Sequence, residues 1–204
     1  MKQKIIILDY GSGNVKSVAN SLDYLNINFS ISNDDTDLDN STHIILPGVG
    51  SYGVSMEKIK KKINLENLKK QVLENKKPFL GICVGMQVLS SIGLEFKQTN
   101  GLGFIDGKTI KLDTNKLPII HTGWNQIDII EKDKLLIDIK NKSTFYFVHS
   151  YKFVPNKKNY ILAKTIYNEV FCSIIKKKNI YGVQFHPEKS QTNGLRLINN
   201  FTNI

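Results

Sequence analysis

The 204-residue chain is long enough for one domain with a sizeable hydrophobic core. Its apolar share of 41% is ordinary for a globular protein, and no apolar run reaches the length of a transmembrane helix, which argues against membrane insertion. The net charge of +10 comes almost wholly from lysine, with Arg196 as the only arginine.

The lysines gather in short clusters, such as residues 58–62 and 176–178, that fall on polar helix faces and turns. These clusters lack the interleaved aromatic residues and bidentate arginines that are typical of nucleic-acid-binding surfaces. We therefore interpret them as solvated faces and expect no nucleic-acid partner. An electropositive surface that meets an acidic partner or a nucleic acid is the alternative.

The amino terminus and the cysteines indicate the compartment. Met1-Lys2-Gln3-Lys4 leads directly into an apolar strand and not into a signal peptide, so we expect a cytoplasmic protein. Cys83 and Cys172 are too few for a disulfide framework, and both should be free thiols. Because Cys172 stands in an apolar run, we expect it to be a small core residue.

The first half of the chain alternates strands with helices. Apolar segments predict strands at residues 5–8, 27–31 and 44–46 and after Pro78, with helices at residues 15–25 and two more between residues 52 and 74. This order predicts an α/β, flavodoxin-like, mostly parallel sheet with helices on both faces. Ligands of such sheets bind at the carboxyl ends of the strands, where Asp9, Pro47 and Cys83 stand.

After Gly93 the pattern changes to short alternating segments separated by Gly, Asn and Pro, which predict an antiparallel, strand-rich carboxyl-terminal half. These segments are residues 104–112, 119–130, 143–153, 160–166, 170–175 and 180–185, and residues 194–201 predict a closing helix. No linker or repeat separates the halves. We expect residues 1–204 to form a single domain.

A cysteine follows an apolar strand in the stretch Gly81-Ile82-Cys83-Val84-Gly85. A strand, a sharp turn and then a helix is the pattern of a nucleophile elbow, which needs small residues two positions before and after the nucleophile. The apolar residues Val84, Val88 and Ile92 follow at helical spacing, and a helix amino terminus favours the thiolate form of Cys83. A buried structural cysteine in an ordinary turn is the alternative.

A second stretch, His186-Pro187-Glu188, ends an apolar strand near the carboxyl terminus. Residues two apart on an extended segment face the same way, so the Glu188 carboxylate can accept from one imidazole nitrogen while the other faces a thiol. Together with Cys83, this pair completes a triad of nucleophile, base and orienting carboxylate.

These motifs resemble the class I (triad) glutamine amidotransferases. Further stretches, in order, resemble the glutaminase subunits of imidazole glycerol phosphate synthase and cover essentially the whole chain. They are Asp9-Tyr10-Gly11-Ser12-Gly13-Asn14, Pro47-Gly48-Val49-Gly50-Ser51-Tyr52, Gly123-Trp124-Asn125 and Tyr146-Phe147-Val148-His149-Ser150-Tyr151.

The resemblance implies hydrolysis of a glutamine side-chain amide, and we expect no cofactor. We also expect no metal site, because no matching Cys or Asp/Glu arrangement accompanies the histidines. The resemblance assigns the attack to Cys83, proton transfer to His186 and orientation of His186 to Glu188. Oxyanion donors are implied at the backbone of Val84 and of Gly48 and Val49, where the peptide is either a switch or a plain turn. The substrate-binding positions implied are Gly50, Gln87, His149, Ser150 and Tyr151. His149 is expected to be structural and not a catalytic base, and His43 and His121 are also expected to be structural.

The resemblance also implies a heterodimer with a (βα)8-barrel synthase subunit, which uses the ammonia to form an imidazole ring in histidine biosynthesis. The positions implied at that interface are Tyr10, Asn14, Trp124, Asn125 and Lys189, with Trp124 as core residue the competing view. Ile120 stands where relatives usually carry proline. A paralogue that supplies ammonia for amidation of a surface sugar is the alternative function, and the intact triad disfavours a non-catalytic binding module.

Overall fold

The computed structural model describes residues 3–115 and 117–204. Met1 and Lys2, on which the expectation about a signal peptide partly rests, lie outside the described residues, as does Lys116.

The strands are β1 (Ile5–Leu8), β2 (Phe29–Ser32), β3 (His43–Gly48), β4 (Phe79–Cys83), β5 (Ile92–Gly93), β6 (Thr99–Asn100), β7 (Gly107–Lys111), β8 (His121–Gln126), β9 (Asp128–Ile129), β10 (Thr144–His149), β11 (Tyr151–Pro155), β12 (Ile161–Tyr167), β13 (Glu169–Lys177) and β14 (Ile180–Val183). The helices are α1 (Val15–Tyr24), α2 (Asp35–Asn40), α3 (Tyr52–Lys62), α4 (Leu65–Lys69), α5 (Val84–Gln87) and α6 (Gln191–Thr202), with the π-helix η1 (Lys70–Glu74) and the 3-10 helices η2 (Lys134–Leu136), η3 (Lys158–Tyr160) and η4 (Pro187–Lys189).

A central sheet in the order β2-β1-β3-β4-β14-β13-β12-β9 runs through both halves of the chain. The first five of these strands are parallel, and the last three join by antiparallel pairing. The predicted α/β, mostly parallel sheet with an antiparallel, strand-rich second half is therefore confirmed. Because β14 lies beside β4, the two segments that carry the triad residues leave the sheet from neighbouring strands.

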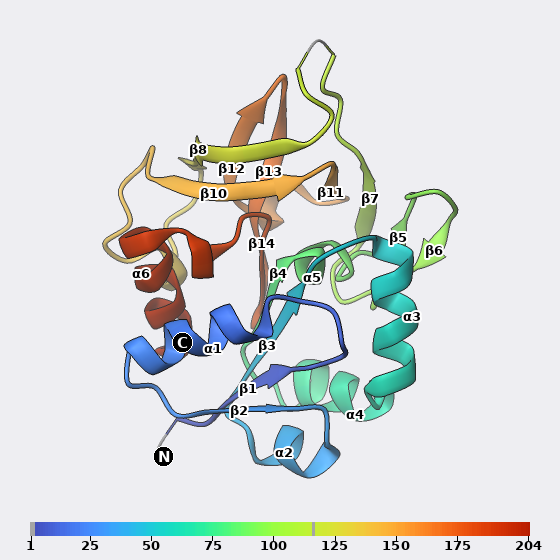
Figure 1. Ribbon diagram of the computed structural model, residues 1–204, viewed down its shortest axis with the longest axis vertical. Coiled ribbons are helices and arrows are strands. Elements are labelled where there is room, and N and C mark those ends of the chain that lie inside the picture. Colours follow the sequence, from blue (N-terminus) through green and yellow to red (C-terminus); the bar gives the residue numbers. More distant parts are fainter. Residues whose placement is uncertain (1–2, 116) are drawn as a thin grey trace.

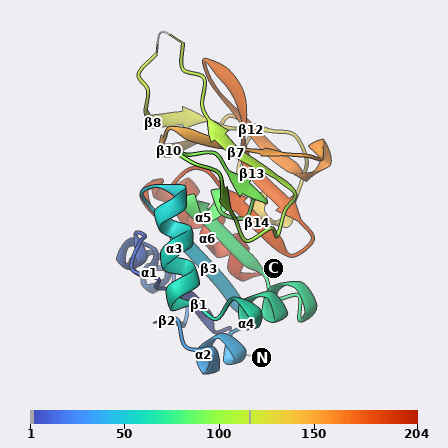
Figure 2. The ribbon, with the colours of Figure 1, turned by 90° about the vertical axis from the view of Figure 1, so that its right-hand side faces the viewer.

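Helices cover both faces of the central sheet, as Figures 1 and 2 show. Helices α1 and α6 pack on one face, and α3 and α4 lie on the other (Figure 1). Strands β10 and β8 pair as a separate ribbon, and β11, β7, β5 and β6 form a further small sheet. Among the described residues, no helix is long and apolar enough to cross a membrane.

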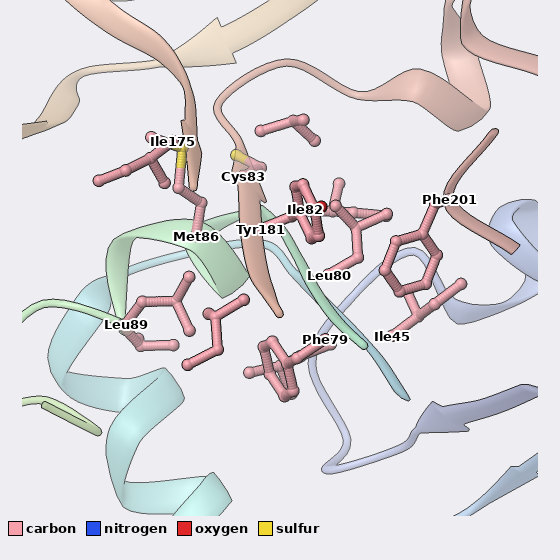
Figure 3. Packing of buried hydrophobic residues seen from close by; sticks show 14 of the residues in the cluster. Ile45, Phe79, Leu80, Ile82, Cys83, Met86, Leu89, Ile175, Tyr181 and Phe201 are labelled. Carbon is pink, nitrogen blue, oxygen red and sulfur yellow. The ribbon is translucent and has the colours of Figure 1, made fainter. Parts of the chain in front are cut away.

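Strand β4 lies in the middle of the hydrophobic core. All five of its residues are buried, as expected for a continuous apolar run covered on both faces. Figure 3 shows Phe201 of α6 close to Ile45 on one side, while Met86 and Ile175 pack on the other. Burial of each such large side chain contributes about 1.5 to 3 kcal/mol to folding, so the core holds the end of β4 firmly in place.

Several local predictions differ from the structure. The second strand begins at Phe29 and not at residue 27, and helix α2 was not expected because its sequence, Asp-Thr-Asp-Leu-Asp-Asn, offers only Leu38 to the core. The helix after Cys83 is a single turn that ends at Gln87, and Ile92 lies in β5. Val88 and Ile92 therefore lie beyond this helix, and only one helical turn follows Cys83.

Candidate active site

Cys83 occupies a strained position at the end of β4. Its backbone has φ 54° and ψ −111°, a region that residues with a side chain rarely adopt. The sharp turn needs both flanking glycines. A Cβ on Gly81 would lie 2.4 Å from the carbonyl oxygen of Gly85, and one on Gly85 would lie 1.9 Å from that of Leu46. The spacing of glycines that predicts an elbow therefore corresponds to two real close approaches.

The Gly48 to Gly50 segment lies beside the elbow because of strand pairing. Gly48, the last residue of β3, is the register partner of Cys83 in β4. A Cβ on Gly48 would come within 2.5 Å of the Gly85 amide nitrogen, so only glycine allows this approach. Val49 is 41% exposed, and Gly50 has φ +92° with open space around it. Gly48 is thus packed closely against the elbow, whereas Val49 and Gly50 lie exposed beside it.

His186 follows β14 and is held at the backbone and at the ring. Its amide nitrogen donates to the Tyr146 carbonyl at 2.9 Å, and the Ser190 hydroxyl donates to its carbonyl at 2.6 Å. The ring Nδ1 lies 2.8 Å from Glu188 Oε1, and both side chains are at most 2% exposed. The acceptor carboxylate requires hydrogen on Nδ1, so Nε2 is the nitrogen left to meet a neighbour.

The Glu188 carboxylate has a second donor that the sequence did not reveal. Asn14, at the amino-terminal cap of α1, donates from Nδ2 to Glu188 Oε1 at 3.1 Å. The Ser17 hydroxyl in turn donates to Asn14 Oδ1 at 2.7 Å and sets the direction of the amide. Asn14 was predicted at the partner surface, but the structure binds its side chain to the triad.

The electrostatics of His186 favour proton exchange with Cys83. Burial alone would lower the pKa of His186, but the Cys83 sulfur and the Glu188 carboxylate outweigh burial and raise this pKa to about 10. His186 Nε2 has no aligned hydrogen-bond partner among the described residues, and Cys83 Sγ lies 3.7 Å from the Val148 carbonyl oxygen. With so high a pKa the His186 ring holds a proton firmly beside the sulfur, as the partner of a thiol nucleophile must.

Cys83 and His186 open into one cavity of about 310 Å³. The cavity is lined by Val49, Gly50, Cys83, Val84, Gln87, Glu95, Ile120, Val148, His149, Ser150, Tyr151 and His186. Every predicted substrate-binding residue is in this set, together with Glu95 and Ile120, which the sequence did not single out as lining. A cavity of this size suits a small-molecule substrate beside the sulfur.

Comparison with known proteins agrees with this geometry. The sequence model of the family described as glutamine amidotransferase class-I matches residues 6–204. The chain belongs to that family. It is 42% identical to the imidazole glycerol phosphate synthase subunit HisH of Pelagibacter ubique, with 98% of this chain and 99% of that protein covered. The subunit of the same name from Aquifex aeolicus is 38% identical over 97% of this chain and 95% of its own length.

Solved structures show the same fold. PurLQS from Thermotoga maritima matches with a TM-score of 0.74 at 19% identity and covers 100% of this chain and 99% of that one. A crystal structure described as a glutamine amidotransferase matches with a TM-score of 0.75 at 14% identity, with 98% and 99% covered. The resemblance inferred from the motifs is thus confirmed at the level of family and fold.

Two glutamine side chains of this amidotransferase, Gln87 and Gln184, form a hydrogen-bonded pair next to the Cys83 sulfur. Gln87 Nε2 donates to the Tyr151 carbonyl at 2.8 Å and to Gln184 Oε1 at 3.1 Å, and Gln184 Nε2 lies 3.9 Å from Cys83 Sγ. Gln184 is fully buried and was missed by sequence reasoning. Its place two residues before His186, on the same face of the extended segment, was the available signal.

The residues predicted at a partner surface fall into two groups. Trp124 is 49% exposed, which excludes the view that it is a core residue, and Lys189 is exposed above the Tyr146 ring. Tyr10 was predicted to face a partner, but its side chain is fully buried and unavailable to one. Asn125 is also engaged within the chain, since its amide donates to His121 Nε2 and to the Ile166 carbonyl.

The remaining histidines and the second cysteine are buried. His43, 7% exposed, contacts the Thr42 hydroxyl and the Phe201 ring far from the cavity. Cys172 is buried, and burial raises the pKa of its thiol, as the prediction of a core residue requires.

Proposed function

We propose that this amidotransferase is the glutaminase subunit of imidazole glycerol phosphate synthase. The observation that carries the proposal is that Cys83 and His186 line one small-molecule cavity while the buried Glu188 carboxylate binds His186 Nδ1. Support for the particular reaction comes from relatives of that name, which match at 38% to 43% identity over nearly the full length of both chains.

In the proposed reaction, Cys83 Sγ attacks the side-chain amide carbon of glutamine while His186 Nε2 takes the thiol proton. The carbon–nitrogen bond then breaks, and His186 returns the proton to the departing ammonia. The thioester that remains is hydrolysed by water, which releases glutamate and restores the thiol. Glu188, hydrogen-bonded to Nδ1, stabilises the imidazolium that forms between these steps.

Charge on the substrate carbonyl oxygen needs hydrogen-bond donors near the sulfur. The proposed donors are the backbone N–H of Val84 and one from the Gly48-Val49-Gly50 segment, which lies beside Cys83 through the β3–β4 register. One such donor typically contributes about 2.7 to 4 kcal/mol of transition-state stabilisation. The open surroundings of Gly50 support a segment that completes the site only when a partner is bound.

The relatives are named as subunits, and the proposed partner is a (βα)8-barrel synthase subunit that receives the ammonia. The half-exposed indole of Trp124 and the exposed Lys189 are the proposed partner contacts, because large exposed aromatic residues are typical interface anchors.

The deciding experiment is a glutaminase assay of the chain with and without its barrel subunit and that subunit's nucleotide ligand. We expect low activity alone and a large rise with the loaded partner. Complementation of a histidine auxotroph that lacks its own glutaminase subunit tests the pathway. A fully active lone chain would contradict the partner-dependent oxyanion site, and failed complementation with intact activity and partner binding would favour the sugar-amidating paralogue.

A further inference from the structure

Two buried histidines that the proposed mechanism does not use form a hydrogen-bond chain that ends in the substrate cavity. His121 and His149 are cross-strand partners at the end of the β8–β10 ribbon and are 3% and 6% exposed. His121 Nδ1 lies 3.0 Å from His149 Nε2. On the cavity side, His149 Nδ1 lies 2.8 Å from the Tyr151 carbonyl oxygen. On the other side, Asn125 Nδ2 lies 3.1 Å from His121 Nε2.

The cavity end of this chain sets the hydrogen on His149. A backbone carbonyl oxygen only accepts, so His149 Nδ1 must donate to Tyr151. In a neutral imidazole the other nitrogen is then an acceptor. His149 Nε2 therefore requires a donor from His121, and that donor is Nδ1.

The far end of the chain imposes the same direction independently. The Asn125 amide is oriented by two backbone groups, since its Oδ1 accepts from the Gln126 amide at 2.8 Å and its Nδ2 donates to the Ile166 carbonyl at 3.0 Å. Asn125 therefore presents an N–H to His121 Nε2, which must accept. Both ends thus require His121 to carry its hydrogen on Nδ1.

An extra proton on either ring has no acceptor in this arrangement. A hydrogen on His121 Nε2 would face the Asn125 N–H, and one on His149 Nε2 would face the donor of His121. Burial also lowers the pKa of His149 to about 3 and that of His121 to about 4. Both rings are therefore neutral Nδ1–H tautomers near neutral pH.

Aromatic packing holds the His121 ring in the plane that the chain needs. The ring stacks on Phe147 with centroids 4.8 Å apart and on Tyr167 with centroids 4.1 Å apart, at interplanar angles of 24° and 23°. Stacking against two rings restricts the plane of the His121 ring, and the two nitrogens at its edge meet His149 and Asn125. The ring is thus restricted in orientation as well as in protonation.

The carbonyl at the cavity end also fixes Gln87. The Tyr151 oxygen accepts from His149 and from Gln87 Nε2, and Gln87 Nε2 donates its second hydrogen to Gln184 Oε1. Both amide hydrogens of Gln87 are then used, so its Oε1 is the atom left to accept from a ligand in the cavity that Gln87 lines.

We propose that His121 is a positioning residue for glutamine binding. Its Nδ1 donor holds His149 in the tautomer that donates to Tyr151, and this contact keeps the Tyr151 carbonyl and the acceptor face of Gln87 in place. Asn125 positions His121 in turn. This inference rests on the proposed glutaminase function. The hydrogen-bond chain that keeps the substrate pocket in its conformation then begins at Asn125, the sequence neighbour of the half-exposed Trp124.

The first test is the tautomeric state of both histidines in the wild-type chain. Nitrogen-15 NMR of the side chains distinguishes Nδ1–H from Nε2–H and from the charged ring. We expect Nδ1–H for His121 and His149 at neutral pH. An Nε2–H tautomer or a charged ring at either residue would overturn the inference, whatever the activity of the enzyme.

The second test compares matched variants in the complex with the barrel subunit. The Asn amide nitrogen can replace His Nδ1, whereas the longer Gln side chain places its amide toward Nε2, so H121N keeps the donor to His149 and H121Q loses it. Both variants lose the stacked ring. We expect H121Q to raise the KM for glutamine by about fivefold, as the loss of one orienting hydrogen bond predicts, with kcat nearly unchanged and H121N close to wild type.

H43Q is the control, because His43 is equally buried but remote from the cavity. It should lower stability without a change in KM. Equal KM values in H121N, H121Q and wild type would overturn the inference. Failure of the proposed function is distinguishable from failure of this inference. In that case the wild-type protein would show no glutamine turnover with its partner, while NMR would still show both histidines as Nδ1–H. If H121Q does not fold, the wild-type tautomers still decide.

Discussion

Asn14 and Glu188 stand 174 positions apart in the sequence, and the amide of one donates to the carboxylate of the other at 3.1 Å. This contact links the first helix of the chain to the residue that orients His186. It gives Glu188 Oε1 two donors, since His186 Nδ1 also binds there. The carboxylate is fully buried, and its other oxygen has no partner among the described residues, so the Asn14 contact matters for its orientation.

We expect Asn14→Ala to lower kcat for glutamine hydrolysis by about tenfold, because a hydrogen bond to a charged group is worth about 1.5 to 3 kcal/mol. The measurement is steady-state turnover with the partner at saturation, so that any change in partner affinity is separated. Ser17→Ala is the graded control, since it removes only the donor that orients Asn14. A kcat equal to wild type in Asn14→Ala would show that Glu188 does not need this donor.

Cys83→Ala should reduce glutamine hydrolysis by at least about 10³-fold, as loss of a nucleophile does in related triads. Partner binding should be unchanged, because the side chain is 3% exposed at the base of the cavity. Cys172→Ala is the matched control, a second buried cysteine in the core of β13. Turnover near the wild-type rate in Cys83→Ala would remove this residue from the mechanism.

Gly85→Ala should destabilise the elbow, because the added Cβ would lie 1.9 Å from the Leu46 carbonyl oxygen, a backbone atom that cannot move away alone. Overpacking of this kind costs about 1 to 3 kcal/mol in the free energy of unfolding.

Gly53→Ala in the first turn of α3 is the control. Its Cβ would meet Thr99 Oγ1 at 3.6 Å, an ordinary contact, and we expect a gain of about 0.4 to 1 kcal/mol from the smaller entropy of the unfolded chain. Urea denaturation of both variants measures the difference, and equal effects would show that the elbow is not tightly closed.

The free energy of unfolding should fall as the pH falls from 6.5 toward 4. The pKa of His149 is lowered by burial to about 3, and that of His121 to about 4, so the unfolded chain binds protons in this range that the native chain does not. Each such histidine contributes a slope of at most about 1.4 kcal/mol per pH unit. His186 does not contribute there, because its raised pKa stabilises the fold fully below 6.5 and loses that effect only as the pH rises toward about 10.

The check is urea denaturation of wild type and of His149→Asn across that pH range. Carboxylates titrate in both proteins, so their difference isolates the histidine contribution. We expect a shallower decline in the variant. Parallel curves would mean that His149 is protonated in the native chain.

The residues that could be predicted from the sequence are those whose role is set by neighbours in the chain. The apolar run of β4, the two glycines around Cys83 and the His186-Glu188 pair carry their geometry in local spacing. Asn14 could not be placed, because its partner lies in the last part of the chain and no local pattern indicates that contact. The extent of the helix after Cys83 was misjudged for the same reason, since Val88 and Ile92 pack against elements from elsewhere.

Strand β14 is inserted between β4 and β13, and it delivers His186 to Cys83 only once it is in place. During synthesis, Cys83 therefore exists without His186 until β14 has been made and has joined the sheet. On the proposed mechanism, a growing or clipped chain that lacks β14 could not release ammonia from glutamine.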